Sequence, residues 1–158
     1  MTAPAVQRGR AWQLGCYLFA LAVAVLAGSM VGGDNPLRTA LVADVAATVA
    51  VFAVSMLRSN HSMYDPYWSV APPVLLFYWL GHPDTCPDGL PLRQVLVSSA
   101  VVAWGVRLTW NFLRGWPGLD HEDWRYGNIR KATGAWFPLA SFGGIHLMPT
   151  LLVFAGCL

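Results

Sequence analysis

The chain has 158 residues, a mean hydropathy of +0.47 and a formal net charge of +2; 56% of its residues are hydrophobic and only 11% are charged. Soluble domains carry about 25% charged residues, so this composition excludes an ordinary soluble protein and favours an integral membrane protein. The three cysteines predict no disulfide framework, and no metal-ligand spacing is present. We expect the lipid bilayer as a partner, no metal and no nucleic acid.

Five apolar runs predict the fold. A helix needs about 20 residues to cross about 30 Å of hydrocarbon, and the runs lie at residues 12–31, 40–57, 66–81, 93–113 and 135–158. They predict an all-α, polytopic transmembrane helix bundle of five spans in one membrane domain, residues 1–158. The third run contains Pro72 and Pro73, so we expect it to be short, kinked or tilted. For the first run, a cleavable signal peptide is the alternative and would leave four spans.

The basic residues predict the orientation, because Lys and Arg accumulate in short cytoplasmic loops. With a cytoplasmic N-terminus, seven basic residues face the cytoplasm, and these are Arg8, Arg10, Arg58, Arg114, Arg125, Arg130 and Lys131. Only Arg38 and Arg93 face the other side, and Arg107 lies within a span. Connectors 58–65 and 114–131 should therefore share one compartment.

Two polar stripes run along predicted spans. Asp44, Thr48 and Ser55 share one face of the second span. One face of the fourth span holds Trp104, Arg107, Asn111 and Arg114. We expect the two stripes to face each other, with the two arginines and Asn111 receiving a phosphate or a carboxylate. The alternative is structural: Asp44 reaches the membrane surface, and Arg107 holds the bundle together.

Two connectors hold the remaining polar residues. Residues 59–69 place Tyr64 beside Asp65, a pair suited to donating a proton or polarising a carbonyl. Asn60 and Ser62 can instead cap turns, and Trp68 can be an interfacial aromatic residue. Residues 121–126 can bind a nucleotide by stacking and hydrogen bonds, or can form an ordinary salt-bridged loop. Composition leaves both readings open.

Three blocks of sequence resemble a known family. They are SMYDPYWS at 62–69, RLTWNFLRGW at 107–116 and EDWRY at 122–126. The pattern resembles the bacterial steroid 5α-reductase-like membrane proteins, formerly a domain of unknown function. The resemblance implies an enzyme of the bacterial cytoplasmic membrane that reduces an activated carbon–carbon double bond in a steroid-like or other lipid with NADPH.

The polar residues described above and the resemblance together give candidate roles. The catalytic candidates are Tyr64, Asp65 and Asp44. The candidates for binding NADPH are Arg107, Asn111, Arg114, Glu122, Asp123, Trp124, Arg125, Tyr126 and Arg130. The candidates for binding the substrate are Ser55, Asn60, Ser62 and Trp68. Family members are much longer and carry a further cofactor motif that is absent here, so we expect this chain to be an N-terminal half that a separately encoded C-terminal half completes.

Two other functions stay open at this point. One is methyl transfer from S-adenosylmethionine to a lipid or an isoprenylcysteine-type thiol, because the same stacking loop suits adenosine. The other is a non-catalytic membrane protein whose arginines bind anionic headgroups.

Overall fold

The computed structural model describes residues 3–31, 35–82 and 91–158, and every regular element among them is helical. The α-helices that cross the bundle are α1 (Ala3–Val31), α2 (Pro36–Leu57), α3 (Tyr67–Leu80), α4 (Leu92–Gly115) and α7 (Met148–Gly156). The shorter elements are the 3-10 helix η1 (His61–Met63), α5 (Trp124–Thr133), the 3-10 helix η2 (Gly134–Trp136), α6 (Phe137–Ala140) and the π-helix η3 (Ser141–Leu147). The predicted all-α bundle is confirmed.

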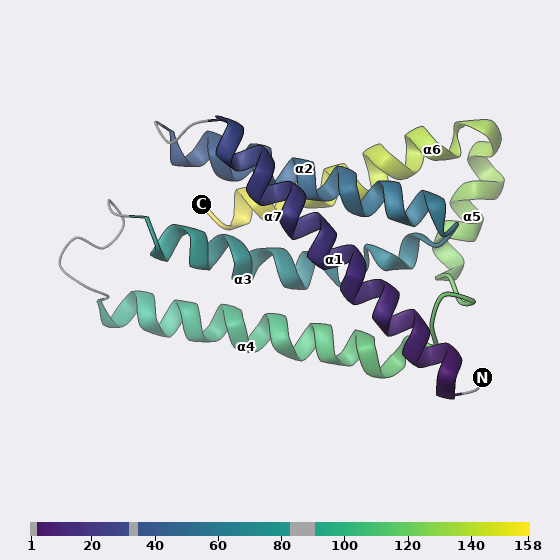
Figure 1. The fold of residues 1–158 in the computed structure, drawn as a ribbon, viewed down its shortest axis with the longest axis horizontal. Helices are drawn as coiled ribbons and strands as arrows, with labels where there is room; N and C mark the ends of the chain where they lie inside the picture. Colours follow the sequence, from purple (N-terminus) through teal and green to yellow (C-terminus); the bar gives the residue numbers. More distant parts are fainter. Residues whose placement is uncertain (1–2, 32–34, 83–90) are drawn as a thin grey trace.

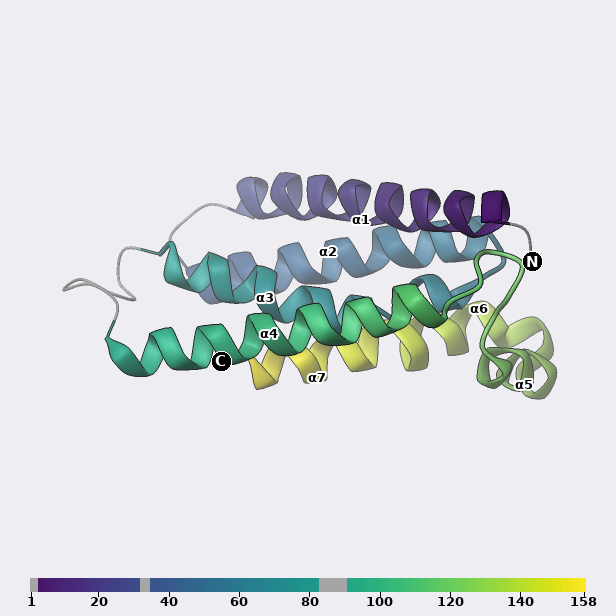
Figure 2. The same cartoon turned by 90° about the horizontal axis from the view of Figure 1, so that it is seen from below.

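The helices form three layers. Helix α1 is an outer layer that crosses α2 and α3 obliquely (Figure 1). Helices α2 and α3 lie beneath it, and α4 and α7 lie on the far side (Figure 2). Successive long helices run in opposite directions, as expected for a chain that crosses a membrane repeatedly.

Four helical stretches are long and apolar enough to cross a membrane: Ala5–Val31, Pro36–Leu57, Leu92–Gly115 and Trp124–Gly156. Helix α3 falls short, because its 14 residues extend only about 21 Å at 1.5 Å per residue. Pro72 and Pro73 lie inside α3, in agreement with the expectation that this segment is short. The residues that precede α3, including η1, occupy the remaining length of the bundle at this position.

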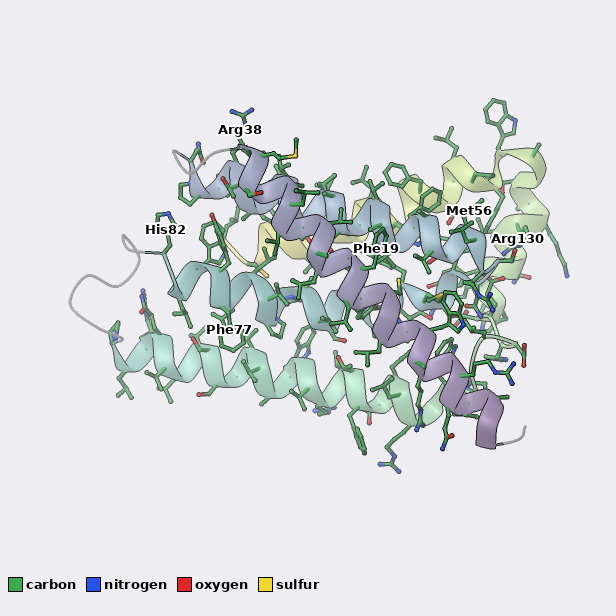
Figure 3. The ribbon with its side chains drawn as sticks, in the orientation of Figure 1. Phe19, Arg38, Met56, Phe77, His82 and Arg130 are labelled. Carbon is green, nitrogen blue, oxygen red and sulfur yellow. The ribbon has the colours of Figure 1, made fainter. Side chains whose placement is uncertain are left out.

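The basic connectors meet at one end of the bundle. The N-terminus of α1 and helix α5 lie at this end (Figure 1), and Arg130 marks it in Figure 3, whereas Arg38 and His82 mark the opposite end. Connectors 58–65 and 114–131 therefore share an end, as predicted. Most of the connector between α3 and α4, residues 83–90, lies outside the described residues.

Local signals explain where the helices begin and end. Asn35 caps α2 by accepting a hydrogen bond from the Arg38 amide at 3.0 Å, and Pro36 occupies the first turn. Asp123 caps α5 by accepting from the Arg125 amide. Gly134 has a φ of +52° where α5 ends. Helix α5 lies across the end of the bundle, and the chain turns after it into α6 (Figure 1).

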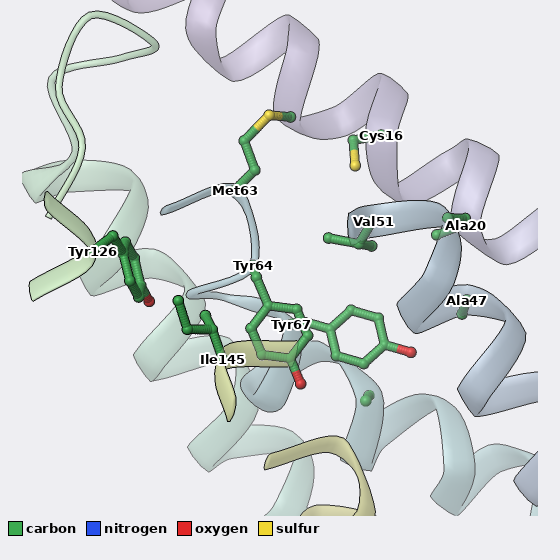
Figure 4. Packing of buried hydrophobic residues seen from close by; sticks show 11 residues of the cluster. Cys16, Ala20, Ala47, Val51, Met63, Tyr64, Tyr67, Tyr126 and Ile145 are labelled. Atoms are coloured by element: carbon green, nitrogen blue, oxygen red, sulfur yellow. The ribbon is translucent and has the colours of Figure 1, made fainter. Parts of the chain in front are cut away.

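Helix α2 lies at the centre of the packing. Its buried residues include Ala47, Ala50 and Val51, which join Cys16 and Ala20 of α1 in one core cluster. Tyr64 and Tyr67 belong to the same cluster (Figure 4), and the Tyr67 ring packs edge-on against Tyr17 of α1. Small residues let membrane helices approach closely and gain van der Waals contact.

The contact between α3 and α4 depends on Gly105. A Cβ atom at this position would lie 2.6 Å from the main-chain oxygen of Ser69 and 2.8 Å from Cγ of Pro73. We predict that G105A separates the two helices and costs about 1–3 kcal/mol of stability, measured as thermal unfolding in detergent micelles. G15A is the matched control, because a Cβ on Gly15 of α1 meets nothing within 4 Å. Equal stability of the two variants would contradict this packing.

Candidate functional site

A cavity of about 480 Å³ lies between α1, α2 and α3. Its walls are almost entirely apolar and include Ala24, Ala47 and Val74. Asp44 is the one carboxyl group among the lining residues that the structure describes. Tyr67 donates a hydrogen bond from its hydroxyl to Oδ1 of Asp44 at 2.7 Å. Tyr67 and Asp44, here called the acid pair, therefore lie on the wall of an apolar cavity.

Nothing in the described chain neutralises this carboxyl group. Asp44 is 6% exposed, and its Oδ2 is buried without a hydrogen-bond partner. An ionisable group inside a span costs roughly 2.5–3.5 kcal/mol on insertion scales and usually has a function. The unpartnered oxygen makes Asp44 the strongest candidate for contact with a bound molecule.

Three hydroxyl groups form a chain behind Asp44. Thr48 donates to the main-chain oxygen of Asp44 at 2.9 Å, and its Oγ1 lies 2.8 Å from Oγ1 of Thr150 on α7. The Thr150 hydroxyl in turn lies 2.7 Å from the Tyr64 hydroxyl. Tyr64 also donates to the main-chain oxygen of His146 at 2.8 Å. These contacts tie α2 to α7.

Two fully buried histidines lie beyond Tyr64. Nδ1 of His61 is 2.8 Å from the Ser141 hydroxyl, and Nδ1 of His146 donates to the main-chain oxygen of Ser141 at 3.0 Å. Nε2 of each ring is buried without a partner. Burial and, to a smaller extent, Arg130 lower the pKa of His61 to about 4, so this ring is neutral at physiological pH. The π-helix η3 supplies both Ser141 and His146.

Hydrogen bonds lock the 115–124 connector onto η1. The side-chain amide of Asn60 donates to the main-chain oxygens of Leu119 and His121 at 2.8 and 2.9 Å. Glu122 accepts from the His61 amide and pairs with Arg130 at 3.0 Å. These bonds hold two stretches of main chain together and leave little capacity for a ligand.

Two more bonds extend this lock to α5. The Asp123 amide donates to the Ser62 hydroxyl at 2.9 Å. Asp123 also forms an ion pair with Arg125 at 2.8 Å, and this contact lowers the pKa of Asp123. Tyr126 donates to Oδ1 of Asp65. Burial raises the pKa of Asp65 to about 6, against the opposing effect of the Tyr126 hydrogen bond.

The predicted catalytic residues separate into two places. Asp44 lies on the cavity, but Tyr64 and Asp65 do not line it. The expectation that Tyr64 and Asp65 act as a pair is wrong, because Tyr64 bonds to His146 and Thr150 whereas Asp65 bonds to Tyr126. The physical reason is that Tyr64 has helical backbone angles, so successive side chains diverge by about 100°.

The predicted polar face of α4 points away from α2. Arg107, Asn111 and Arg114 are exposed, and Trp104 is 46% exposed. Helix α4 instead packs on α3 through Gly105 and Thr109, and the Thr109 hydroxyl lies 2.9 Å from that of Ser69. The expectation that the two stripes face each other is wrong, because the small residues allow the closer helix approach and they occupy the opposite side of α4.

The predicted substrate-binding residues do not line the cavity. Ser55 is fully buried in α2, and Asn60 and Ser62 hold the connectors together. Trp68, on α3, is 51% exposed. Trp124, a predicted cofactor residue on α5, is 73% exposed. Among the predicted cofactor residues, Glu122, Asp123, Arg125, Tyr126 and Arg130 meet at the basic end, apart from the α4 face.

Tyr67 and Thr150 are the functional candidates that sequence reasoning missed. Tyr67 lies in the block 62–69 without an assigned role, and only the fold brings it to Asp44. Thr150 had a signal, because His146 and Thr150 are polar residues four apart in an apolar run, a spacing that places both on one helix face.

A family model describes the same region. It matches residues 51–158, and its description reads "Protein of unknown function (DUF1295)". The chain belongs to this family. The match includes Tyr67, the α4 face and Thr150, whereas α1 and Asp44 lie outside it. Neither the curated proteins nor the solved structures gave a match.

In this DUF1295 chain, the stability that the contact between the η1 region and α5 contributes should depend on pH through Asp65. Its pKa of about 6 in the folded chain exceeds the ordinary value of 3.8, so the folded state binds the proton more tightly. The cost of the buried carboxylate is absent below pH 3.8 and fully present above pH 6. We predict that wild type loses stability relative to D65N, by on the order of 2 kcal/mol, as pH rises from 4 to 7.

Thermal unfolding at a series of pH values in detergent measures this difference. D120N is the control, because Asp120 is exposed at the same end of the bundle. A wild-type to D65N difference that stays constant with pH would contradict the assignment.

Proposed function

We propose that this chain binds a carbonyl-bearing, steroid-like lipid in the α1–α3 cavity and polarises its carbonyl group as part of an NADPH-dependent reductase of activated carbon–carbon double bonds. One observation carries the proposal: the Tyr67–Asp44 pair stands on the wall of an otherwise apolar cavity. Ligand sites commonly combine apolar walls with a few placed polar groups.

The size and the walls of the cavity support a rigid lipid. A volume of about 480 Å³ lies within the range of roughly 300–1,000 Å³ for small-molecule sites. Ala20, Ala24 and Gly28 of α1 and Ala43 of α2 contribute small side chains to the walls. This leaves width for a flat ring system between the helices.

The acid pair supports the carbonyl assignment. When a conjugated carbonyl compound is reduced, negative charge develops on the carbonyl oxygen, and donors aimed at that oxygen stabilise it. The carboxyl oxygen Oδ2 of Asp44 has no hydrogen-bond partner among the described residues, and Asp44 lines the cavity. A carboxyl group that holds its proton on Oδ2 would donate it to the ligand while Oδ1 accepts from Tyr67.

NADPH would supply the hydride when bound, but the described residues do not enclose a dinucleotide beside the cavity. Arg125 and Arg130 are engaged in ion pairs. Arg107 and Arg114 are exposed and suit phosphate chemically, yet α4 contributes nothing to the cavity lining. We therefore derive no hydride step from this chain, and we propose that a separately encoded partner completes the cofactor site.

The arrangement of basic residues supports an orientation. We propose that the end holding α5 and the N-terminus of α1 faces the cytoplasm of a bacterial cell and that the bundle spans its cytoplasmic membrane several times. The seven basic residues of the positive-inside count belong to this end.

A second function has one observation in its favour. The exposed Arg107, Asn111 and Arg114 of α4 suit anionic lipid headgroups, as a non-catalytic membrane protein would use them. Methyl transfer from S-adenosylmethionine stays a prediction with no observation in its favour.

Binding tests the proposal directly. We predict that the purified protein in nanodiscs binds an enone steroid more tightly than the analogue without the carbonyl group, and that Y67F and D44N reduce this ratio by about fivefold or more, the value of one hydrogen bond. Y78F is the matched control, because Tyr78 lines the same cavity but donates to the Pro36 main-chain oxygen.

Equal binding of the two lipids by wild type would refute carbonyl recognition. NADPH oxidation with the enone, measured with and without the partner encoded nearest to this chain, tests the reductase assignment. Binding of S-adenosylmethionine without binding of NADPH would replace it with methyl transfer.

A further inference from the structure

The hydroxyl chain behind the acid pair has more contacts than protons. Tyr64, Thr150 and Thr48 have three hydroxyl protons, but they make four short contacts: to the His146 oxygen, between Tyr64 and Thr150, between Thr150 and Thr48, and to the Asp44 oxygen. All three residues are at most 2% exposed. One contact must therefore always lack a proton.

This count permits four arrangements, one for each contact that lacks the proton. In three of them Thr48 donates to the main-chain oxygen of Asp44. In the fourth, every hydroxyl points the other way: Thr48 donates to Thr150, Thr150 to Tyr64, and Tyr64 to the main-chain oxygen of His146. Each hydroxyl keeps its own proton and only rotates about its C–O bond, so no covalent bond changes.

The arrangements with and without a proton between Thr48 and the Asp44 oxygen act differently on Tyr67. Its single proton has two acceptors on Asp44: Oδ1 at 2.7 Å and the main-chain oxygen at 3.2 Å. When Thr48 already donates to the main-chain oxygen, the Tyr67 proton is directed to Oδ1. When Thr48 points away, the main-chain oxygen competes for that proton and the carboxyl group partly loses its donor.

We propose that Thr48 and Thr150 are positioning residues that set the direction of this hydroxyl chain and thereby control whether Tyr67 donates to the Asp44 carboxyl group. The proposal rests on the proposed function only for the use of that carboxyl group toward a ligand. It makes the α2–α7 contact part of the site, although α7 does not line the cavity.

The proton count gives the two threonines opposite effects. In T48V the donor to the Asp44 oxygen is gone, so Tyr67 shares that oxygen and its bond to Oδ1 weakens. In T150V the chain is cut, so Thr48 donates only to Asp44 and the bond from Tyr67 to Oδ1 strengthens. Y64F has the same effect as T150V, because Thr150 then donates only toward Thr48. Residues that merely packed α2 against α7 would not differ in sign.

Infrared spectroscopy of the ligand-free protein in nanodiscs tests this. The stretching band of the Asp44 carboxyl group is identified by its absence from D44N, and Y67F gives its position without the Tyr67 donor. We expect the T48V band to shift toward the Y67F position and the T150V and Y64F bands to shift away from it, with T150S restoring the wild-type band. T109V is the matched control, because it removes one member of the separate Ser69–Thr109 hydroxyl pair.

Equal bands in wild type, T48V and T150V, or shifts of the same sign in the two variants, would overturn the proposed control of Tyr67 by the hydroxyl chain, here called the relay. Should T150V fail to fold, the sign comparison passes to T48V and Y64F. Because these spectra need no ligand, a normal relay with no enone binding would refute the proposed function alone. Normal enone binding with unshifted bands would refute the relay alone.

Discussion

A bilayer supplies no water to polar groups, and the polar stripe of α2 must therefore find its partners within the protein. Asp44, Thr48 and Ser55 are at most 6% exposed in a helix that can cross the membrane. The partners of Asp44 and Thr48 come from α3 and α7. This requirement brings α2, α3 and α7 together, and it explains why α2 is the most buried of the four candidate spans.

The hydrogen bonds of the molecule divide into two kinds by this measure. At the basic end, Asn60, Glu122 and Asp123 satisfy main-chain donors and acceptors of the connectors, so their polar side chains hold the fold. At Asp44, the buried carboxyl oxygen Oδ2 has no hydrogen-bond partner. Buried polar atoms without a partner also occur on described residues such as His61 and His146, but among the residues that carry such atoms only Asp44 lines the cavity. The candidate site is therefore placed at the cavity wall, not where charged residues are most numerous.

The sequence predicted the helices well because apolar runs and basic connectors report directly on the membrane, and Asp44 was found because an acid within a span is costly wherever it points. Prediction failed where the answer depended on how two helices meet. The face of α4 was assigned from Arg107 and Asn111, yet Gly105 and Thr109 form the contact with α3. In the same way, Tyr64 was adjacent to Asp65 in sequence, but their bonds run to His146 and Tyr126. The composition of one helix does not say which residues of an adjacent helix will contact it.

The acid pair also joins parts of the chain that the family match separates. Asp44 precedes the residues that the DUF1295 model matches, while Tyr67 and Thr150 lie within them. The matched part thus contains the phenol and the hydroxyl support, and α1 and the first half of α2 add the carboxyl group and most of the cavity walls. The exposed arginines of α4 lie on the side of that helix turned away from α3, and hence away from the cavity. A reaction that used both the cavity and these arginines would need a cofactor that reaches around the basic end of α3, where hydrogen bonds join the connectors.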